Sequence, residues 1–151
     1  MGPVAALKAC PLFKGFTPAG LEILAQIANE RKFASGVPLF AENAVGDSLL
    51  VLAQGRVKLT MKNKAAEQAP LGELGPGEHL GELSLIRQGQ RMCTATALTP
   101  VVAIEIRHAD FQRLLGQKPQ ACVKLLMGIV STFGQKVMDN RDNLRALVER
   151  S

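Results

Sequence analysis

Residues 79–96 read HLGELSLIRQGQRMCTAT, and this stretch carries the strongest signal in the chain. Gly81 allows a tight turn, and residues 82–86 are enough for one helical turn. The start of a helix presents backbone N–H groups and a partial positive charge, which attract a phosphate. Arg91 adds a fixed positive charge with forked N–H donors, and Glu82 adds an acceptor for a hydroxyl group. The stretch therefore predicts a site for an anion that carries both a phosphate and a sugar.

Around this stretch, short apolar runs alternate with glycine-containing turns. Four runs have the length and pattern of strands: residues 48–52, 57–61, 94–98 and 101–106. Gln54 and Gly55 predict a hairpin-like turn between the first two runs, and residues 62–70 predict a polar loop. Several short strands at this spacing are typical of a sandwich or barrel.

Helical patterns lie toward both ends of the chain. Thr17 suits an N-cap and Pro18 suits the first turn of a helix, which we expect to end within residues 32–36. Residues 109–115 predict a short helix, and residues 120–149 predict one long helix. The long helix carries a seam with heptad spacing, formed by Leu126, Val130, Phe133, Val137, Asn140, Leu144 and Leu147.

The stretch resembles the phosphate-binding cassette of the cyclic nucleotide-binding domain family. Residues 81–85, GELSL, match the cassette core G-E-[LIV]-[AGS]-L. Arg91 falls, without a gap, where the regulatory subunit of cyclic-AMP-dependent protein kinase has its phosphate-binding arginine. The bacterial catabolite activator family carries one extra residue there. The resemblance extends over residues 11–148, and its glycine-containing runs are SGVPLFAE (35–42), VGDS (45–48), QGRV (54–57) and LGPG (74–77).

This resemblance implies a mainly β fold with flanking helices (α+β): a jelly-roll-like β-roll with an N-terminal helix and a long C-terminal helix. It implies that Glu82 accepts a hydrogen bond from the ribose 2′-hydroxyl and that Arg91 pairs with the cyclic phosphate. Backbone amides of the cassette would complete the phosphate contacts. The ligand-binding residues that the resemblance implies are Gly81, Glu82, Leu83, Ser84, Arg91, Met92, Cys93, Leu71 and Leu74.

The sequence departs from the family pattern in three places. Leu80 replaces the phenylalanine that often precedes the cassette glycine. Met92 stands where cyclic-GMP-preferring kinases often have a threonine that holds the guanine. Because Met92 has no hydroxyl, we expect cyclic AMP, with cyclic GMP as the alternative ligand. The Thr-Ser pair with which the bacterial activator contacts adenine is missing, and Asp139 and Asn140 lie near its place.

Composition argues against several other classes of protein. The net charge is +5 with a pI of about 9.4, but the basic residues are scattered and there is no Trp or Tyr, so direct DNA binding is not expected. We see no signal peptide and no stretch near the roughly 18 apolar residues of a membrane span, so we expect a cytoplasmic protein. His79 and His108 are the only histidines and cannot supply a metal-enzyme ligand set. We therefore expect no metal, no cofactor and no enzymatic activity.

These observations predict a single domain over residues 1–151, with a β-roll over 30–107 and C-terminal helices over 108–149. It would act as a cyclic nucleotide receptor that signals through its last helix to a downstream protein or to a second copy of the chain. Two other readings stay open. One is a nucleotide-free dimerisation module of the same fold, and the other is a transcription regulator that lacks the usual helix-turn-helix.

Local alternatives stay open as well. The apolar seam could pack against the β-roll instead of forming a homodimer, and Asn140 could set the register of a dimer or reach the bound base. Glu82 and Arg91 could form an ion pair without any ligand. Cys93 could have a redox role or could fill space behind the phosphate site.

Overall fold

The computed structural model describes residues 2–149, and Met1, Arg150 and Ser151 of the expected domain lie outside the described residues. The N-terminal helices are α1 (Pro3–Lys8), η1 (Pro11–Phe13) and α2 (Pro18–Ala25). The strands are β1 (Ala28–Phe33), β2 (Pro38–Phe40), β3 (Val45–Gly46), β4 (Ser48–Gln54), β5 (Val57–Lys62), β6 (Gln68–Leu74), β7 (His79–Leu80), β8 (Gly89–Gln90), β9 (Thr94–Ala97) and β10 (Val101–Arg107). The other helices are α3 (Leu83–Ile86), α4 (His108–Gln117), α5 (Pro119–Asp139) and α6 (Arg141–Glu149).

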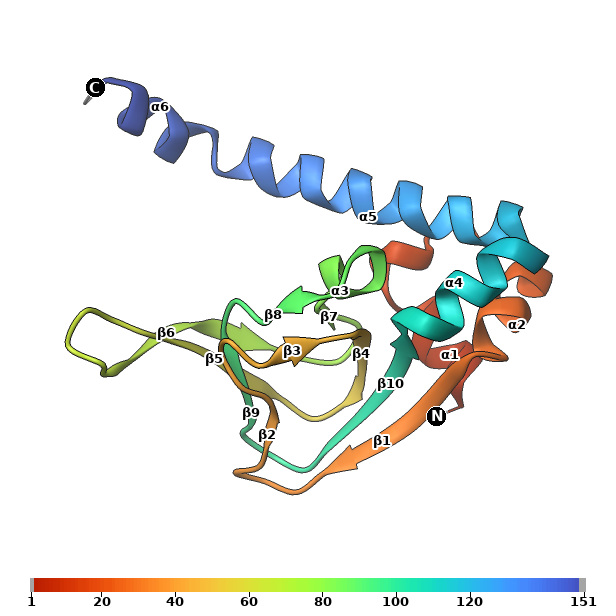
Figure 1. Cartoon of the computed structure of the whole chain (residues 1–151), viewed down its shortest axis with the longest axis horizontal. Helices are drawn as coiled ribbons and strands as arrows, with labels where there is room; N and C mark the ends of the chain where they lie inside the picture. Colours follow the sequence, from red (N-terminus) through yellow and green to blue (C-terminus); the bar gives the residue numbers. More distant parts are fainter. Residues whose placement is uncertain (1, 150–151) are drawn as a thin grey trace.

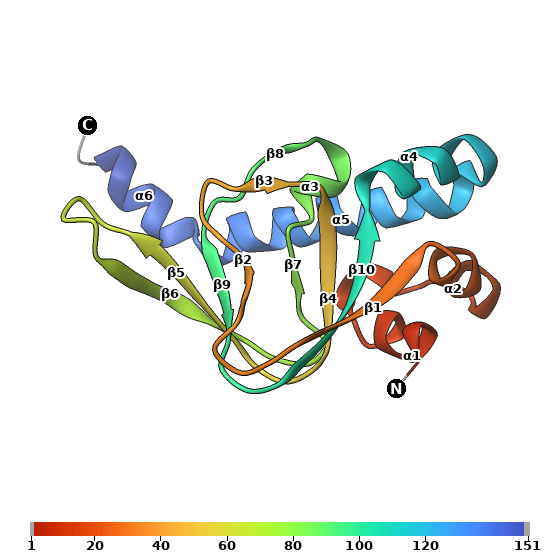
Figure 2. The same ribbon diagram turned by 60° about the horizontal axis from the view of Figure 1, so that its bottom comes forward.

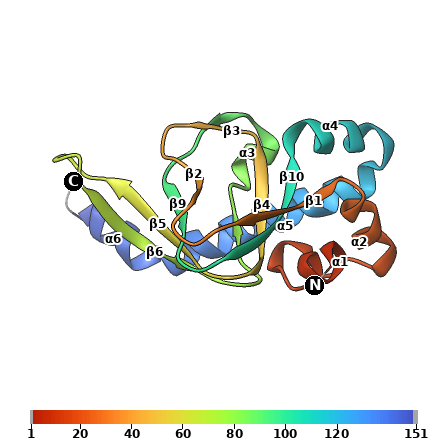
Figure 3. The same ribbon diagram turned by 90° about the horizontal axis from the view of Figure 1, so that it is seen from below.

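The strands form antiparallel sheets that curl into a β-roll (Figure 1). One sheet has the order β1-β10-β4-β7, a second has the order β2-β9-β5-β6, and β3 pairs with β8. Helices α1, α2 and α4 gather at one end of the roll, and the β5–β6 hairpin projects from the other end (Figures 1 and 3). Helix α5 runs alongside the roll between these two ends, as Figure 2 also shows.

Strand β4 separates two hydrophobic cores. Because successive side chains of a strand point to opposite faces, Leu49 and Val51 join the core beneath the helices, while Leu50 and Leu52 join the interior of the roll. All the residues of β4 except Gln54 are buried. The helical core also holds the inner face of α5, which comprises Cys122, Leu125 and Ile129.

The N-terminal helix begins as expected and ends earlier than expected. Thr17 accepts a hydrogen bond from the backbone N–H of Gly20 at 3.1 Å, so its N-cap role is confirmed. The helix ends at Ala25 and not within residues 32–36, because residues 28–33 pair along their whole length with β10. This pairing with a distant strand overrides the local helical pattern.

The turn at Gly55 is not a hairpin turn. Strand β4 pairs with β10 and β7, whereas β5 pairs with β6 and β9, so the chain changes sheets at Gly55. Gly55 has φ +87°, and a Cβ there would overlap the backbone oxygen of Pro100, which explains why glycine is needed. The expected polar loop over residues 62–70 is also shorter, because residues 68–74 form β6 and complete a hairpin with β5.

The long C-terminal segment is two helices and not one. Asn140 leaves the helical conformation with φ −99° and ψ 14°, between α5 and α6. Its side-chain Nδ2 donates to the backbone oxygen of Lys136 at 2.8 Å. Asparagine side chains compete with the backbone for hydrogen bonds in this way, which accounts for the break in the heptad seam.

The apolar seam does not fold back onto the roll along its length. Only Leu126 at its start packs against the core, while Val130, Val137, Leu144 and Leu147 are exposed. Among the described helices, α5 is the one long and apolar enough, by length and composition alone, to cross a membrane, with a mean hydropathy of 1.2, although no such stretch was expected from the sequence. The apolar residues of α5 lie on two separate faces of the helix. One face packs in the protein core, and the other is exposed.

Helix α5 touches η1 so closely at Gly128 that a Cβ there would overlap the backbone oxygen of Leu12. Gly128→Ala should therefore push α5 away from η1 and lower the free energy of unfolding by about 1–3 kcal/mol. The matched control is Gly134→Ala on the same helix, where nothing lies within 4 Å of an added Cβ. Because alanine favours helix, the control should raise stability by up to about 1 kcal/mol. Urea unfolding measures both, and equal stability of the two variants would contradict the close contact.

Candidate functional site

A pocket of about 290 Å³ lies between the cassette and the inner face of α5. Seven of the residues expected from the sequence line it together: Gly81, Glu82, Leu83, Ser84, Arg91, Met92 and Cys93. The remaining lining residues come from β2, β7, β8 and α5, and they are Phe40, Leu80, Gln90, Phe133 and Lys136.

Two short connections bring the ends of the cassette together. After β7 the chain turns at Gly81, which has φ +74°, and the Gly81 oxygen accepts from the Ser84 N–H at 3.0 Å to start α3. On the other side, the β3–β8 ladder leads to Arg91, whose backbone N–H donates to the Ala44 oxygen at 2.7 Å. These bonds fix where the Arg91 side chain enters the protein.

The Arg91 side chain is buried, with the residue only 7% exposed. Its two terminal nitrogens donate to Ser84 Oγ at 3.1 Å and to Ser48 Oγ at 3.3 Å. The guanidinium carbon lies 4.3 Å from the centre of the Phe40 ring, in a cation–π contact. The Nε–H is buried and has no hydrogen-bond partner among the described residues. A buried donor without a partner is costly, so this group is suited to an additional acceptor.

Two glycines make room for this guanidinium. A Cβ on Gly46 would lie 2.6 Å from Arg91 Nε, and a Cβ on Gly81 would overlap the Arg91 guanidinium. Burial lowers the pKa of Arg91, while the negative charges of Asp47 and Glu105 act in the opposite direction. The site thus holds a desolvated positive charge, which favours an anionic ligand.

Glu82 lines the same pocket and is already partnered. Its Oε2 lies 3.2 Å from His79 Nδ1, and its Oε1 lies 3.5 Å from Lys136 Nζ on α5. Burial alone would raise the pKa of Glu82, but the hydrogen bonds from His79 and from its own backbone N–H, with the charges of His79 and Lys136, lower it to about 2. Glu82 is therefore an ionised, acceptor-only group at neutral pH.

A direct ion pair between Glu82 and Arg91 is not what the structure contains. Within residues 2–149, Glu82 pairs with His79 and Lys136, and the side-chain hydrogen bonds of Arg91 go to Ser48 and Ser84. The two opposite charges thus line the same pocket without pairing with each other.

Sequence reasoning missed the contribution of α5 to this pocket. The heptad spacing predicts Phe133 only as a member of the apolar seam, and no sequence motif predicts Lys136 as a pocket residue. The two are three residues apart and so share a helix face, which is the signal that could have linked them. Asn140 ends α5 and does not line the pocket, and its expected role in setting a dimer register stays a prediction.

Leu71 and Leu74, which the resemblance also implies as ligand contacts, are not among the residues that line this pocket. Leu71 is 54% exposed on β6, and Leu74 packs at the edge of the core inside the roll, and neither lines the pocket. The β5–β6 hairpin that carries them projects from the roll, away from α3 (Figures 1 and 2). A contact of Leu71 and Leu74 with a bound nucleotide stays a prediction of the family resemblance.

A wider groove of about 670 Å³ lies between η1 and α5. Its charged groups are surface lysines, among them Lys14 and Lys124, and none of its lining residues is buried. The cassette pocket is smaller but holds a buried charge with an unpaired donor. The chemistry therefore places the candidate site in the cassette pocket.

A family model described as the cyclic nucleotide-binding domain matches residues 30–118 of this chain. The cyclic AMP receptor protein of Thermus thermophilus is 29% identical over 113 residues, which make up 75% of this chain and 52% of that protein. The chain thus spans about half the length of this curated relative.

Two solved structures share the architecture. The N-terminal domain of a transcriptional regulator from Streptomyces coelicolor A3(2) is 33% identical with a TM-score of 0.79, covering 87% of this chain and 94% of that chain. The catabolite activator protein of Thermus thermophilus is 25% identical with a TM-score of 0.80, covering 91% and 63%. These matches confirm both the fold class and the family resemblance expected from the sequence.

The lowered pKa of Glu82 predicts a specific acid sensitivity. Because the pKa falls from the ordinary 4.5 to about 2 on folding, the ionised carboxylate stabilises the fold fully above pH 4.5. This stabilisation is lost as the pH falls toward about 2. Urea unfolding at about pH 6 and about pH 3 should show a smaller loss of stability for Glu82→Gln than for the wild type.

Glu67→Gln is the matched control for this experiment, because Glu67 is an exposed carboxylate in the turn between β5 and β6. This variant should keep the wild-type pH dependence. An equal loss of stability in the wild type and in Glu82→Gln would show that the contacts of Glu82 do not stabilise its charge.

Proposed function

The chain belongs to the cyclic nucleotide-binding domain family, and from that premise we propose that it is a regulatory receptor for cyclic AMP. Residues 1–151 form one such domain in this proposal. The family is one of regulatory ligand-binding domains, so the nucleotide is bound and not consumed. The catabolite activator and cyclic AMP receptor names of the relatives support this ligand class.

Arg91 is the observation that carries the proposal. Arg91 lines the pocket with a buried guanidinium, which offers both charge and N–H donors to a cyclic phosphate, and its Nε–H has no partner among the described residues. Such a group would be an unfavourable feature of a domain that never binds an anion. Leu83, Ser84, Met92 and Cys93 line the same pocket, and the backbone amides of Leu83, Met92 and Cys93 are proposed as further phosphate contacts. The Ser84 N–H already donates to the Gly81 oxygen, so Ser84 would contact the phosphate only by sharing that donor.

Glu82 is proposed to accept the ribose 2′-hydroxyl. Its carboxylate is fixed in place by His79 and lies in the same pocket as Arg91. A nucleotide that spans the pocket would then contact Glu82 through its sugar and Arg91 through its phosphate. Gly81 would let the ligand approach the backbone closely at the turn.

The preference for cyclic AMP over cyclic GMP rests on Met92. This side chain is 71% exposed at the pocket and offers no hydroxyl to a guanine base. Thioether and alkyl groups suit the apolar face of either purine. We therefore propose that the site prefers cyclic AMP because it lacks a hydroxyl that would bind the guanine base of cyclic GMP.

Signal transfer is proposed to run through α5, because Phe133 and Lys136 of this helix line the pocket. A bound ribose competes with Lys136 for the Glu82 carboxylate, which changes how α5 is held against the cassette. Ligand binding shifts the helix only if its two positions differ in affinity for the nucleotide. The proposed setting is the cytoplasm, with a downstream protein as the recipient of the signal.

The exposed face of α5 and α6 is proposed to pair with a second copy of the chain. Val130 and Val137 on α5 and Leu144 and Leu147 on α6 expose apolar side chains. We do not propose that this chain binds DNA directly, because its basic side chains are scattered along the sequence.

The central test is calorimetric titration of nucleotide-stripped protein with cyclic AMP and cyclic GMP. We expect micromolar or tighter binding of cyclic AMP, weaker binding of cyclic GMP, and a loss of about 10- to 100-fold in affinity for Arg91→Ala. The reason is that Arg91→Ala removes a charge-assisted phosphate contact.

Arg87→Ala is the matched control, because Arg87 lies in the same cassette but is exposed. It should bind like the wild type. Absence of heat with either nucleotide, from folded protein shown to be free of carried-over ligand, would refute the receptor and favour a nucleotide-free dimerisation module. Equal loss in both arginine variants would refute the specific role of Arg91.

The proposed dimer is tested by sedimentation at micromolar concentration. The wild type should sediment with twice the 16.2 kDa mass of one chain, and the double variant Val130→Asp, Val137→Asp should sediment as a monomer. Two charges on the apolar face oppose its burial in an interface. Ser131→Asp, on a neighbouring face of α5, should stay dimeric, and a monomeric wild type would contradict the proposal.

A further inference from the structure

Behind Arg91 lies a chain of buried polar groups that no expected ligand contact includes. We propose that Ser48 and Glu105 are positioning residues, which hold the Arg91 guanidinium in its binding orientation before a nucleotide arrives. The inference rests on the proposed function, because it concerns how the same phosphate site is prepared. It assigns a role to two residues that do not line the pocket.

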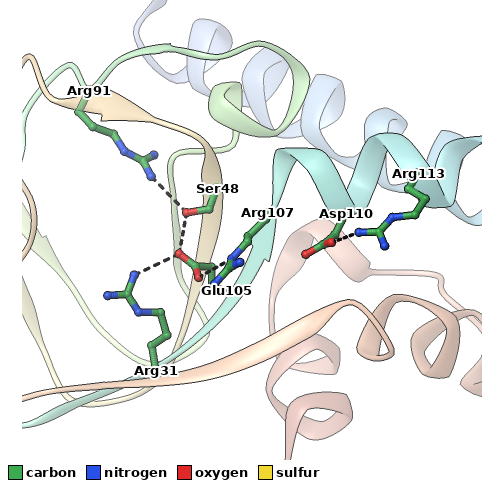
Figure 4. Close-up of polar contacts among 7 residues, drawn as sticks. All are labelled: Arg31, Ser48, Arg91, Glu105, Arg107, Asp110 and Arg113. Atoms are coloured by element: carbon green, nitrogen blue, oxygen red, sulfur yellow. Dashed lines mark hydrogen bonds and ion pairs between the residues drawn. The ribbon is translucent and has the colours of Figure 1, made fainter.

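The contacts form an unbroken series from the pocket to the far edge of the sheet (Figure 4). Arg91 donates to Ser48 Oγ at 3.3 Å, and the Ser48 hydroxyl donates to Glu105 Oε2 at 2.9 Å. Arg31 donates to the same Oε2 at 3.1 Å, and Arg107 Nε lies 3.6 Å from Oε1. Ser48 is buried, and Glu105 is only 6% exposed.

The hydroxyl in the middle of this series has one consistent orientation. A guanidinium only donates hydrogen bonds, and an ionised carboxylate only accepts them. Ser48 must therefore give its single proton to Glu105 and accept from Arg91. Removing the carboxylate charge weakens this preference, and removing the hydroxyl separates the carboxylate from Arg91.

The sheet places these groups on one face. In the pairing of β10 with β4, Arg107 lies opposite Ser48, and Glu105 is two residues away on the same face as Arg107. In the pairing of β10 with β1, Arg31 lies opposite Ala103 and is therefore a diagonal neighbour of Glu105. Three adjacent strands thus fix the carboxylate from three sides.

Glu105 has two functions in this arrangement. Arg31 and Arg107 satisfy its charge at the outer side, so a buried carboxylate is tolerated. Its remaining negative potential reaches Arg91 through Ser48 and offsets part of the cost of burying the guanidinium. Because Arg91 is already ordered, phosphate binding does not carry the entropy cost of fixing that long side chain.

The test measures cyclic AMP affinity for Ser48→Ala and Glu105→Gln beside the wild type. Each variant should weaken binding about three- to tenfold, since one hydrogen bond that orients Arg91 is lost. Thr60→Val is the matched control, because it removes a buried hydroxyl from β5, a strand that carries no member of the series. It should leave the affinity unchanged.

A double-mutant cycle separates positioning from general damage to the fold. In an Arg91→Lys background the Ser48→Ala change should cost less than about twofold, because there is no guanidinium left to orient. Equal losses in both backgrounds would overturn the inference. Wild-type affinity for cyclic AMP in both Ser48→Ala and Glu105→Gln would also overturn it. So would a loss of affinity in Thr60→Val equal to theirs.

A second readout needs no nucleotide. In NMR spectra the Nε–H of Arg91 should give one sharp signal, protected from solvent exchange, in the wild type and in Thr60→Val. Ser48→Ala and Glu105→Gln should broaden this signal or speed its exchange, and an unchanged signal would overturn the inference. If the wild type fails to bind any cyclic nucleotide, the proposed function is refuted while this readout still decides whether Ser48 and Glu105 hold Arg91.

Discussion

A buried, positively charged guanidinium is the constraint on which the rest of this structure depends. Arg91 can lie beneath the cassette only because Gly46 and Gly81 have no side chains and because Ser48 and Ser84 offer hydroxyl acceptors. The short β3–β8 ladder fixes where the Arg91 side chain enters the protein. The turn after β7 places Gly81 and Ser84 beside the guanidinium. Within residues 2–149 the buried Nε–H has no hydrogen-bond partner, and Arg91 makes no ion pair with Glu82, so the guanidinium keeps donor capacity that an anionic ligand could use.

Helix α5 connects this site to the rest of the molecule. Its inner face is fixed in the core, and Gly128 brings its backbone against η1. Farther along, Phe133 and Lys136 reach the pocket, where Lys136 meets the same carboxylate that is proposed to bind ribose. The helix is therefore anchored in the core at one end and held at the pocket by the contact of Lys136 with Glu82, with which a bound ribose would compete in the proposed function. In that proposal the nucleotide moves the helix only if it binds the two helix positions with different affinity.

The sequence predicted the cassette well because its residues act within a short span. Gly81, Glu82 and Arg91 are ten residues apart or fewer along the chain, and local turn chemistry brings them together. Ser48, Glu105 and Lys136 reach Arg91 or Glu82 only through sheet register and helix placement, which no local sequence pattern encodes. The same reason explains why the turn at Gly55 looked like a hairpin and why residues 28–33 looked helical.

The most direct test of the central claim is a crystal structure of the protein grown with cyclic AMP. The account predicts the cyclic phosphate within hydrogen-bond distance of Arg91 Nε, the ribose 2′-hydroxyl on Glu82, and Lys136 moved from that carboxylate. Ser48 should keep its contacts with Arg91 and Glu105. A nucleotide bound elsewhere, such as in the groove between η1 and α5, with Arg91 Nε still unpaired, would contradict the account.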